Sequence, residues 1–351
     1  MNRDILPYLL CAECGADDLW LEVYSEMSDK RVMEGCLTCP KCSSWFRIEN
    51  GIIDLLPMQL RRKNYERFMR KNEHFAARHG LTPPFPQDTI IQNDFSDKTK
   101  PVGAFEDVAD YEKRVVNNPY YKALDQVAFF DWMERNLTPR DFVLDIGCGT
   151  GRQCIPLAER GIRSVGVDID EEMLQEAVKK LDRLPSGGKV DFIVGDGENP
   201  PVRQKSFTAC VLYGVLHHLS DKRKAVANAA TKLLPGAFVY SLDPHKSSAR
   251  FVFDLLMRLW KLYVEEADED PLISTSQLCE WMNDARINGK VRLSTYLPPH
   301  IFVANLSANI FLLKITDGIC SRIPGIRNIG GVIIFEGRNR ADANEVEIKL
   351  A

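Results

Sequence analysis

The chain has 351 residues, of which 45% are hydrophobic and 27% charged, a composition typical of globular proteins and unlike that of disordered chains. A formal net charge of -4 excludes a global positive field that would steer the molecule toward nucleic acid. No apolar run reaches the roughly 18 residues of a membrane-spanning helix. The opening residues MNRDILPYLLCAEC are a poor signal peptide, so we expect a cytoplasmic protein.

The N-terminal segment carries two C-x-x-C turns separated by 24 residues. The intervening sequence contains two strand-like runs around a polar turn, which is the arrangement of a zinc ribbon. We predict a structural Zn²⁺ bound by Cys11, Cys14, Cys39 and Cys42. Cys36 is then a surplus thiol. The alternative quartet replaces Cys42 with Cys36 and leaves Cys42 unexplained.

The same segment, from LLCAECG to FRIENGIIDLLP, resembles the small zinc ribbons of the Trm112 type over residues 1–57. Because such ribbons activate or accompany methyltransferases, the resemblance implies a methyltransferase partner or domain.

Residues 58–119 are predicted to form a linker and an N-terminal helical segment. Seven Lys/Arg residues against two Glu within residues 58–80 are compatible with a basic helix, although a solvated connector more commonly has this pattern. Residues 81–103 are rich in Pro and polar residues, which indicates an irregular linker. From Tyr111 to Pro139 the apolar positions have helical spacing.

Strand-like and helix-length segments then alternate. This pattern predicts a parallel, doubly wound α/β sheet. The five apolar runs are FVLDIG, RSVGVDI, VDFIVGD, FTACVLYG and AFVYSLD. Two further strands are predicted later, at VRLSTYLPP and GGVIIFEGR.

A glycine cluster, IGCGTG, follows the first of these runs, and glycines there allow a close approach of backbone to a ligand. Arg152 occupies the position where a dinucleotide fingerprint has its last glycine, which excludes that motif. Asp168 ends the second run, 19 residues after Gly149, where a carboxylate can accept hydrogen bonds from ribose hydroxyls. Asp170 is the better N-cap for the next helix.

Together these motifs resemble class I S-adenosylmethionine-dependent methyltransferases, in the branch with quinone and sterol methylases, over residues 120–338. The resemblance implies that Asp145 and the loop hold the methionine end, that Asp168 holds the ribose, and that Asp196 meets the adenine. Tyr213 would lie near the methionine. The full implied set of cofactor-binding residues is Asp145, Gly147, Gly149, Thr150, Gly151, Asp168, Ile169, Asp196, Gly197 and Tyr213. Thr208 and Ala237 depart from the family pattern away from these contacts.

His217 and His218 follow the fourth run and are the candidates for a general base. Residues 249–322 contain apolar helical pieces and are predicted to form a lid over the carboxyl ends of the strands. Such a lid favours an apolar substrate and permits a peripheral membrane contact, although extra core helices would give the same pattern.

The sequence therefore predicts a seven-stranded Rossmann-like methyltransferase sheet with a helical lid, a zinc ribbon and a polar tail at residues 339–351. We expect methyl transfer to an O or C atom of an apolar small molecule such as a lipid, quinone or secondary metabolite. An RNA base methyltransferase that uses the ribbon and the basic segment 61–78 is the alternative. A third hypothesis is a non-catalytic scaffold. The oligomeric state is not indicated.

Overall fold

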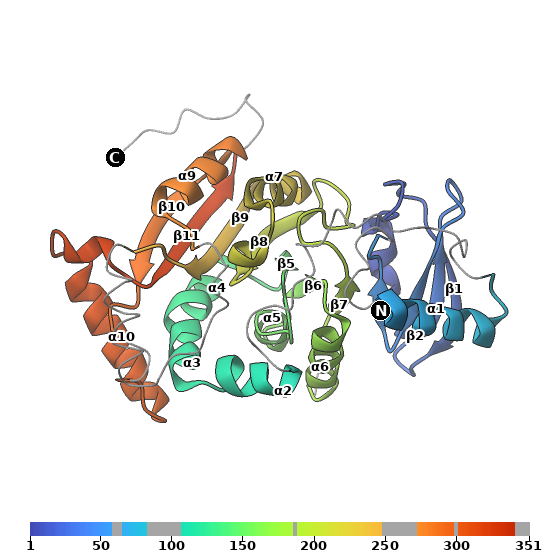
Figure 1. Cartoon of the computed structure of the whole chain (residues 1–351), viewed down its shortest axis with the longest axis horizontal. Coiled ribbons are helices and arrows are strands. Elements are labelled where there is room, and N and C mark those ends of the chain that lie inside the picture. Colours follow the sequence, from blue (N-terminus) through green and yellow to red (C-terminus); the bar gives the residue numbers. More distant parts are fainter. Residues whose placement is uncertain (58–64, 83–106, 185–187, 248–271, 298–300, 341–351) are drawn as a thin grey trace.

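The computed structural model describes residues 1–57, 65–82, 107–184, 188–247, 272–297 and 301–340 (Figure 1). All named strands of these residues join one eleven-stranded sheet. Its order is β1-β2-β3-β4-β7-β6-β5-β8-β9-β11-β10. None of the helices in the described ranges is long and apolar enough to cross a bilayer.

Seven of these strands form the predicted α/β sheet. They are β5 (Phe142–Ile146), β6 (Arg163–Asp168), β7 (Val190–Val194), β8 (Phe207–Tyr213), β9 (Leu233–Pro244), β10 (Ile287–Ser294) and β11 (Val332–Asn339). The first five run parallel, and β11 is antiparallel between β9 and β10. The chain moves from β5 to β6 and β7 on one side, then to β8 on the other. Ligands bind open α/β sheets at this kind of switch point.

Helices cover both faces of the sheet, which explains why β5 and β7 are buried along their whole length. One face carries α3 (Pro119–Asp125), α4 (Asp131–Asn136), α5 (Cys154–Glu159) and α6 (Glu171–Asp182). The other carries α7 (Lys222–Lys232) and α9 (Thr275–Asp284). A π-helical stretch, Gln126–Phe130, joins α3 to α4, so the helix predicted before Pro139 is confirmed.

The described residues form further short helical elements and one long helix, α10. They are α2 (Val108–Tyr111), the π-helical turn Glu112–Val116, α10 (Leu306–Cys320), and the 3-10 turns Arg3–Tyr8, Leu216–His218 and Ile326–Asn328. Helix α10 belongs to the predicted lid and packs against α3. The other lid helix predicted, residues 249–264, lies outside the described residues.

The N-terminal ribbon consists of β1 (Trp20–Glu26), β2 (Val32–Thr38), β3 (Trp45–Glu49) and β4 (Ile52–Asp54). Its last strand pairs in parallel with β7, with Ile53 opposite Ile193. The ribbon therefore extends the edge of the large sheet, and the two share one hydrophobic core (Figure 1). The sequence motifs gave no sign of this pairing.

The basic segment contains helix α1 (Tyr65–His79), so the helical alternative describes it better than the solvated connector. It lies on the ribbon through the buried ring of Phe75, whose centroid is 6.0 Å from those of Tyr24 and Trp45. Most of the predicted linker, residues 83–103, falls outside the described residues.

Candidate functional site

The four predicted zinc ligands come together at the tip of the ribbon. Their sulfur atoms all lie within 4.8 Å of one another, and the Cys11–Cys42 and Cys14–Cys39 pairs are each 3.6 Å apart. Thiolates about 2.3 Å from a tetrahedral zinc lie roughly 3.8 Å from one another. The cluster therefore fits Zn²⁺, which would supply structural cross-linking there.

Cys36 lies outside this cluster. It is buried on β2, where its sulfur lies 3.8 Å from the Leu37 carbonyl and 3.9 Å from Thr38 Oγ1. Burial raises the pKa of its thiol to about 11. The geometry favours the quartet with Cys42 over the quartet with Cys36.

The glycine loop follows β5 and turns beneath the carboxyl end of the sheet. Gly147, Gly149 and Gly151 have φ angles of +73°, +51° and +79°, a region that favours glycine. A Cβ on Gly147 would also lie 2.3 Å from the side chain of Val215. The loop backbone therefore requires glycine, as expected for a segment that a ligand approaches closely.

Asp168 ends β6 directly opposite this loop. Its carboxylate accepts hydrogen bonds from the backbone N–H groups of Gly149, at 2.8 Å, and Asp170, at 2.9 Å. Burial raises the pKa of Asp168 to about 6. Asp170 caps α6 as predicted, since it accepts from the N–H groups of Glu172 and Met173. Ile169 follows Asp168 and packs against the core beside α6.

The neighbouring strand brings Asp196 and Gly197 to the same edge. The N–H of Gly195 donates to the Asp168 carbonyl at 2.9 Å, which joins the loops after β6 and β7. Asp196 accepts from the N–H of Glu198 at 2.9 Å.

Asp145 lies in the last part of β5 and is almost fully buried. One carboxylate oxygen receives the Cys154 thiol at 3.3 Å, while Oδ1 has no hydrogen-bond partner among the described residues. Burial raises the pKa of Asp145 to about 7. Thr150, also buried, donates to Glu112 at 2.5 Å and is 3.0 Å from Lys180.

Tyr213 ends β8 within a polar cluster that sequence reasoning missed. Its hydroxyl donates to Asp125 at 2.6 Å, and the Arg152 guanidinium lies over its ring at 4.9 Å. Asp125 and Arg152 form a bidentate ion pair at 2.7 and 2.9 Å. No local sequence pattern indicates this pair. Asp125 lies within an amphipathic helix, and the position of Arg152 in the sequence only excludes a dinucleotide-binding motif.

His217 and His218 occupy the 3-10 turn after β8, with ring centroids 3.7 Å apart. His217 Nδ1 is 2.9 Å from Asp243 Oδ1, and the same oxygen accepts from the His217 backbone N–H at 3.2 Å. Asp243 is fully buried near the end of β9, and its Oδ2 has no partner within the described ranges. Strands β8 and β9 are parallel neighbours, so their carboxyl ends lie side by side. This adjacency was the feature from which the contact between His217 and Asp243 could have been predicted.

Comparisons with known proteins agree with this geometry. Residues 144–241 match the family described as "Methyltransferase domain". Over 156 residues the chain is 27% identical to a ubiquinone biosynthesis O-methyltransferase of Saccharophagus degradans, covering 43% of this chain and 65% of the relative. An O-methyltransferase of Pyrenophora dematioidea is 29% identical, covering 57% and 76%.

A third relative has another class of substrate in its name. It is an 18S rRNA (guanine-N(7))-methyltransferase of Bos taurus, 34% identical over 139 residues, which cover 38% of this chain and 43% of the relative. All three relatives are methyltransferases, and the stretch that matches the family, residues 144–241, contains the glycine loop and the strand ends around it. The chain therefore contains a class I S-adenosylmethionine-dependent methyltransferase domain.

Proposed function

We propose that this enzyme methylates a hydroxyl oxygen of an apolar small molecule, with His217 as general base. The observation that carries the proposal is the 2.9 Å contact between His217 Nδ1 and the buried carboxylate of Asp243. A carboxylate that accepts from Nδ1–H leaves Nε2 as the proton acceptor and holds the ring in one orientation. Asp243 thus acts as a positioning residue.

The proposed cofactor site follows the glycine loop from the methionine end to the adenine end. Asp145 and residues 147–151 would hold the methionine moiety, and the unpartnered Oδ1 of Asp145 suits a ligand with a positively charged amino group. Asp168 and Ile169 would hold the ribose, and Asp196 and Gly197 the adenine. Tyr213 would line the methionine end, with Arg152 covering its ring.

In this proposal, S-adenosylmethionine supplies an electrophilic methyl group when bound. The residues of the chain orient the acceptor and remove one proton from it. As the acceptor oxygen bonds to the methyl carbon, the carbon–sulfur bond breaks and the hydroxyl proton passes to His217 Nε2. General-base assistance of this kind contributes about 10²- to 10⁴-fold in rate.

An apolar acceptor is supported by the name of the ubiquinone biosynthesis O-methyltransferase relative and by α10. This helix comes after β10 in the chain. It is bonded to the carboxyl end of that strand, because Asp317 Oδ1 accepts from the Thr295 N–H at 3.1 Å. It exposes Phe311, Ile315 and Ile319, and an apolar surface of this kind suits contact with an apolar molecule. A lid that includes α10 remains a proposal, as does contact with a membrane surface.

RNA is the second candidate acceptor, favoured by the rRNA methyltransferase relative. Two cations of the predicted phosphate contact, residues 61–78, are ion-paired within the protein. Lys71 pairs with Glu171 at 3.0 Å, and Arg78 pairs with Glu34 and Glu49 at 2.7 and 3.0 Å. The first residues of the segment lie outside the described ranges. Ion-paired side chains are less available to phosphates.

Another surface for RNA is an open groove lined by α4 and the antiparallel strands β10 and β11. It is lined by three acidic residues, Asp131, Glu134 and Glu336, and by six cationic ones, Arg135, Arg286, Lys290, Arg292, Arg338 and Arg340. Arg135 and Arg292 are ion-paired with Glu336, at 3.5 and 3.3 Å. By strand register the groove lies at the end of β9 away from His217, because Arg338 pairs with Phe238 whereas Val332 pairs with Pro244.

Methyl transfer from labelled S-adenosylmethionine to hydroxylated quinone precursors and phenols tests the proposal. His217→Gln should lower kcat at least a hundredfold and Asp243→Asn nearly as much, while both retain cofactor affinity. Equal activity of wild type and His217→Gln would refute the base. Product on structured RNA, with binding that weakens steeply between about 50 and 200 mM salt, would refute the apolar acceptor. Absence of turnover on both classes would support the scaffold hypothesis.

A further inference from the structure

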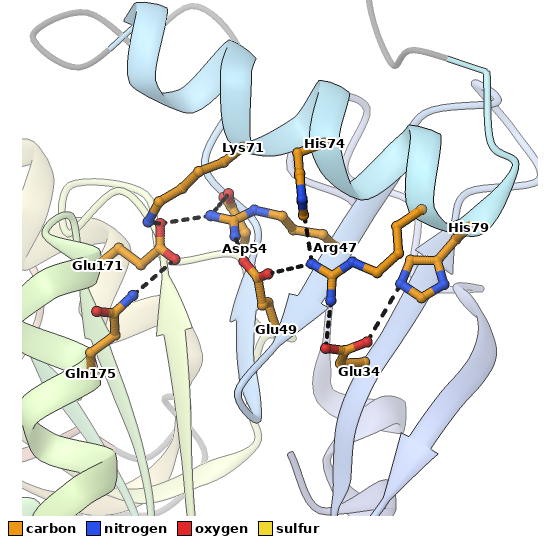
Figure 2. A network of polar contacts seen from close by, with 10 residues as sticks. Glu34, Arg47, Glu49, Asp54, Lys71, His74, His79, Glu171 and Gln175 are labelled. Carbon is orange, nitrogen blue, oxygen red and sulfur yellow. Dashed lines mark hydrogen bonds and ion pairs between the residues drawn. The ribbon is translucent and has the colours of Figure 1, made fainter.

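Arg47 is a buried charge at the junction between the ribbon and the methyltransferase sheet. It lies on β3, and only 2% of its side chain is exposed. Its guanidinium contacts three carboxylates: Glu49 through Nη1, Asp54 through Nη2 at 3.4 Å, and Glu171 through Nη2 at 2.6 Å (Figure 2). A buried guanidinium in this position holds together the elements that supply its partners.

Two of these partners, Glu171 and Asp54, lie close to the proposed nucleoside-binding residues. Glu171 is the first residue of α6, immediately after the N-cap and three residues after Asp168. Asp54 ends β4, opposite Val194 of β7, and Asp196 lies two residues beyond that strand. Arg47 therefore lies behind both the ribose-side loop and the adenine-side loop.

The two loops are also bonded to each other and to the ribbon. The Gly195 N–H donates to the Asp168 carbonyl, and the Leu55 N–H donates to the Val194 carbonyl, each at 2.9 Å. Asp168 in turn holds the glycine loop through the Gly149 N–H. A shift of the first turn of α6 would therefore move Asp168 and loosen the glycine loop.

Glu171 is held in its charged form for this contact. Burial raises its pKa, but the positive charges of Arg47 and Lys71 outweigh burial and lower the pKa below its ordinary value. Gln175 Nε2 donates to the other carboxylate oxygen at 3.4 Å. Removal of Arg47 would leave buried carboxylates with less compensation, a change that proteins relieve by local rearrangement.

We propose that Arg47 is a positioning residue for the nucleoside end of the cofactor site, through which the ribbon sets the affinity for S-adenosylmethionine. This inference rests on the proposed cofactor site. Because coupling between two sites is reciprocal, a bound nucleoside also stabilises the ribbon against local opening.

Arg31 provides a matched control. It also joins the ribbon to α6, through a 2.8 Å ion pair with Asp182, but Asp182 is the last residue of the helix. Arg31→Met therefore removes a ribbon–α6 ion pair at the end away from Asp168. Arg47→Met removes a ribbon–α6 ion pair at the end of the helix beside Asp168.

The test measures binding of S-adenosylmethionine by titration calorimetry in wild type, Arg47→Met, Arg47→Lys and Arg31→Met. We expect the Kd to rise about tenfold in Arg47→Met, equal to about 1.4 kcal/mol, and to be intermediate in Arg47→Lys. Arg31→Met should stay within twofold of wild type. Steady-state kinetics of Arg47→Met should show a raised KM for the cofactor and a kcat close to that of wild type. Bound metal should be equal in all four proteins.

Unchanged affinity in a folded Arg47→Met protein would overturn the proposal, as would an equal loss in Arg31→Met. If Arg47→Met does not fold, Glu171→Gln decides instead: it keeps a hydrogen-bond acceptor but removes the charge, and wild-type affinity in it would overturn the proposal. Failure of wild type to bind the cofactor would refute the proposed function as well, so the two failures are distinguishable.

Discussion

Breaking the ion pair between Asp125 and Arg152 is expected to destabilise the methyltransferase domain strongly. About 10% of the Asp125 side chain and 9% of the Arg152 side chain are exposed. Both carboxylate oxygens are used, since Arg152 donates to each and the Tyr213 hydroxyl donates to Oδ1. Breaking a buried pair by removing one partner costs about 3–5 kcal/mol, because the other charge stays buried without compensation.

Asp125→Ala should therefore lower the free energy of unfolding by about 3–5 kcal/mol. Urea denaturation followed by tryptophan fluorescence measures this, because Trp132 lies in the same helical layer. The control is Glu134→Ala on α4, which breaks a half-exposed pair with Arg160 and should cost no more than about 1 kcal/mol. Equal costs for the two variants, or a cost below 1 kcal/mol for Asp125→Ala, would show that Arg152 finds water or another partner.

The thiol cluster, the ribose carboxylate and the buried Asp145 each give a further prediction. Metal analysis should find one zinc per chain in Cys36→Ser and none in Cys39→Ser; the reverse pattern would establish the other quartet. Affinity for S-adenosylmethionine should fall as pH decreases through about 6, because a protonated Asp168 accepts ribose hydroxyls less well; calorimetry at pH 5 and 7.5 measures it. Burial keeps a proton on Asp145 that the unfolded chain releases near pH 4, so wild type should lose up to about 4 kcal/mol of stability between pH 4 and 7 relative to Asp145→Asn. Parallel denaturation curves at all pH values would contradict the last expectation.

Features predictable from the sequence were those written in local patterns. Alternating apolar runs predicted the seven central strands, and the glycine spacing predicted a loop whose φ angles require glycine at Gly147 and Gly149. The doubled C-x-x-C turns predicted the four thiols that come together. In each of these cases the spacing itself constrains the backbone, so one sequence is sufficient.

The contacts that couple these elements were not predictable in this way. Arg47 and Glu171 are 124 residues apart, and nothing local to either indicates the other. Asp125 and Arg152 are only 27 apart, but a carboxylate on an amphipathic helix has no distinctive pattern. Ion pairs of this kind depend on the packing of whole elements, which periodicity does not encode. Asp243 is intermediate, since the order of neighbouring strands places it beside His217.

Pairing between β4 and β7 explains why a ribbon precedes the catalytic domain. All five residues of β7 are buried, and its apolar side chains belong to cores on both faces of the sheet. Without β4, this strand would present unpaired backbone groups at an apolar edge, an arrangement that promotes aggregation. The ribbon covers that edge, and the four thiols stabilise the ribbon when they bind metal. The predicted zinc ligands in the ribbon and the proposed nucleoside-binding residues at the strand ends are thus connected through one sheet, so loss of metal should weaken cofactor binding before the sheet itself unfolds.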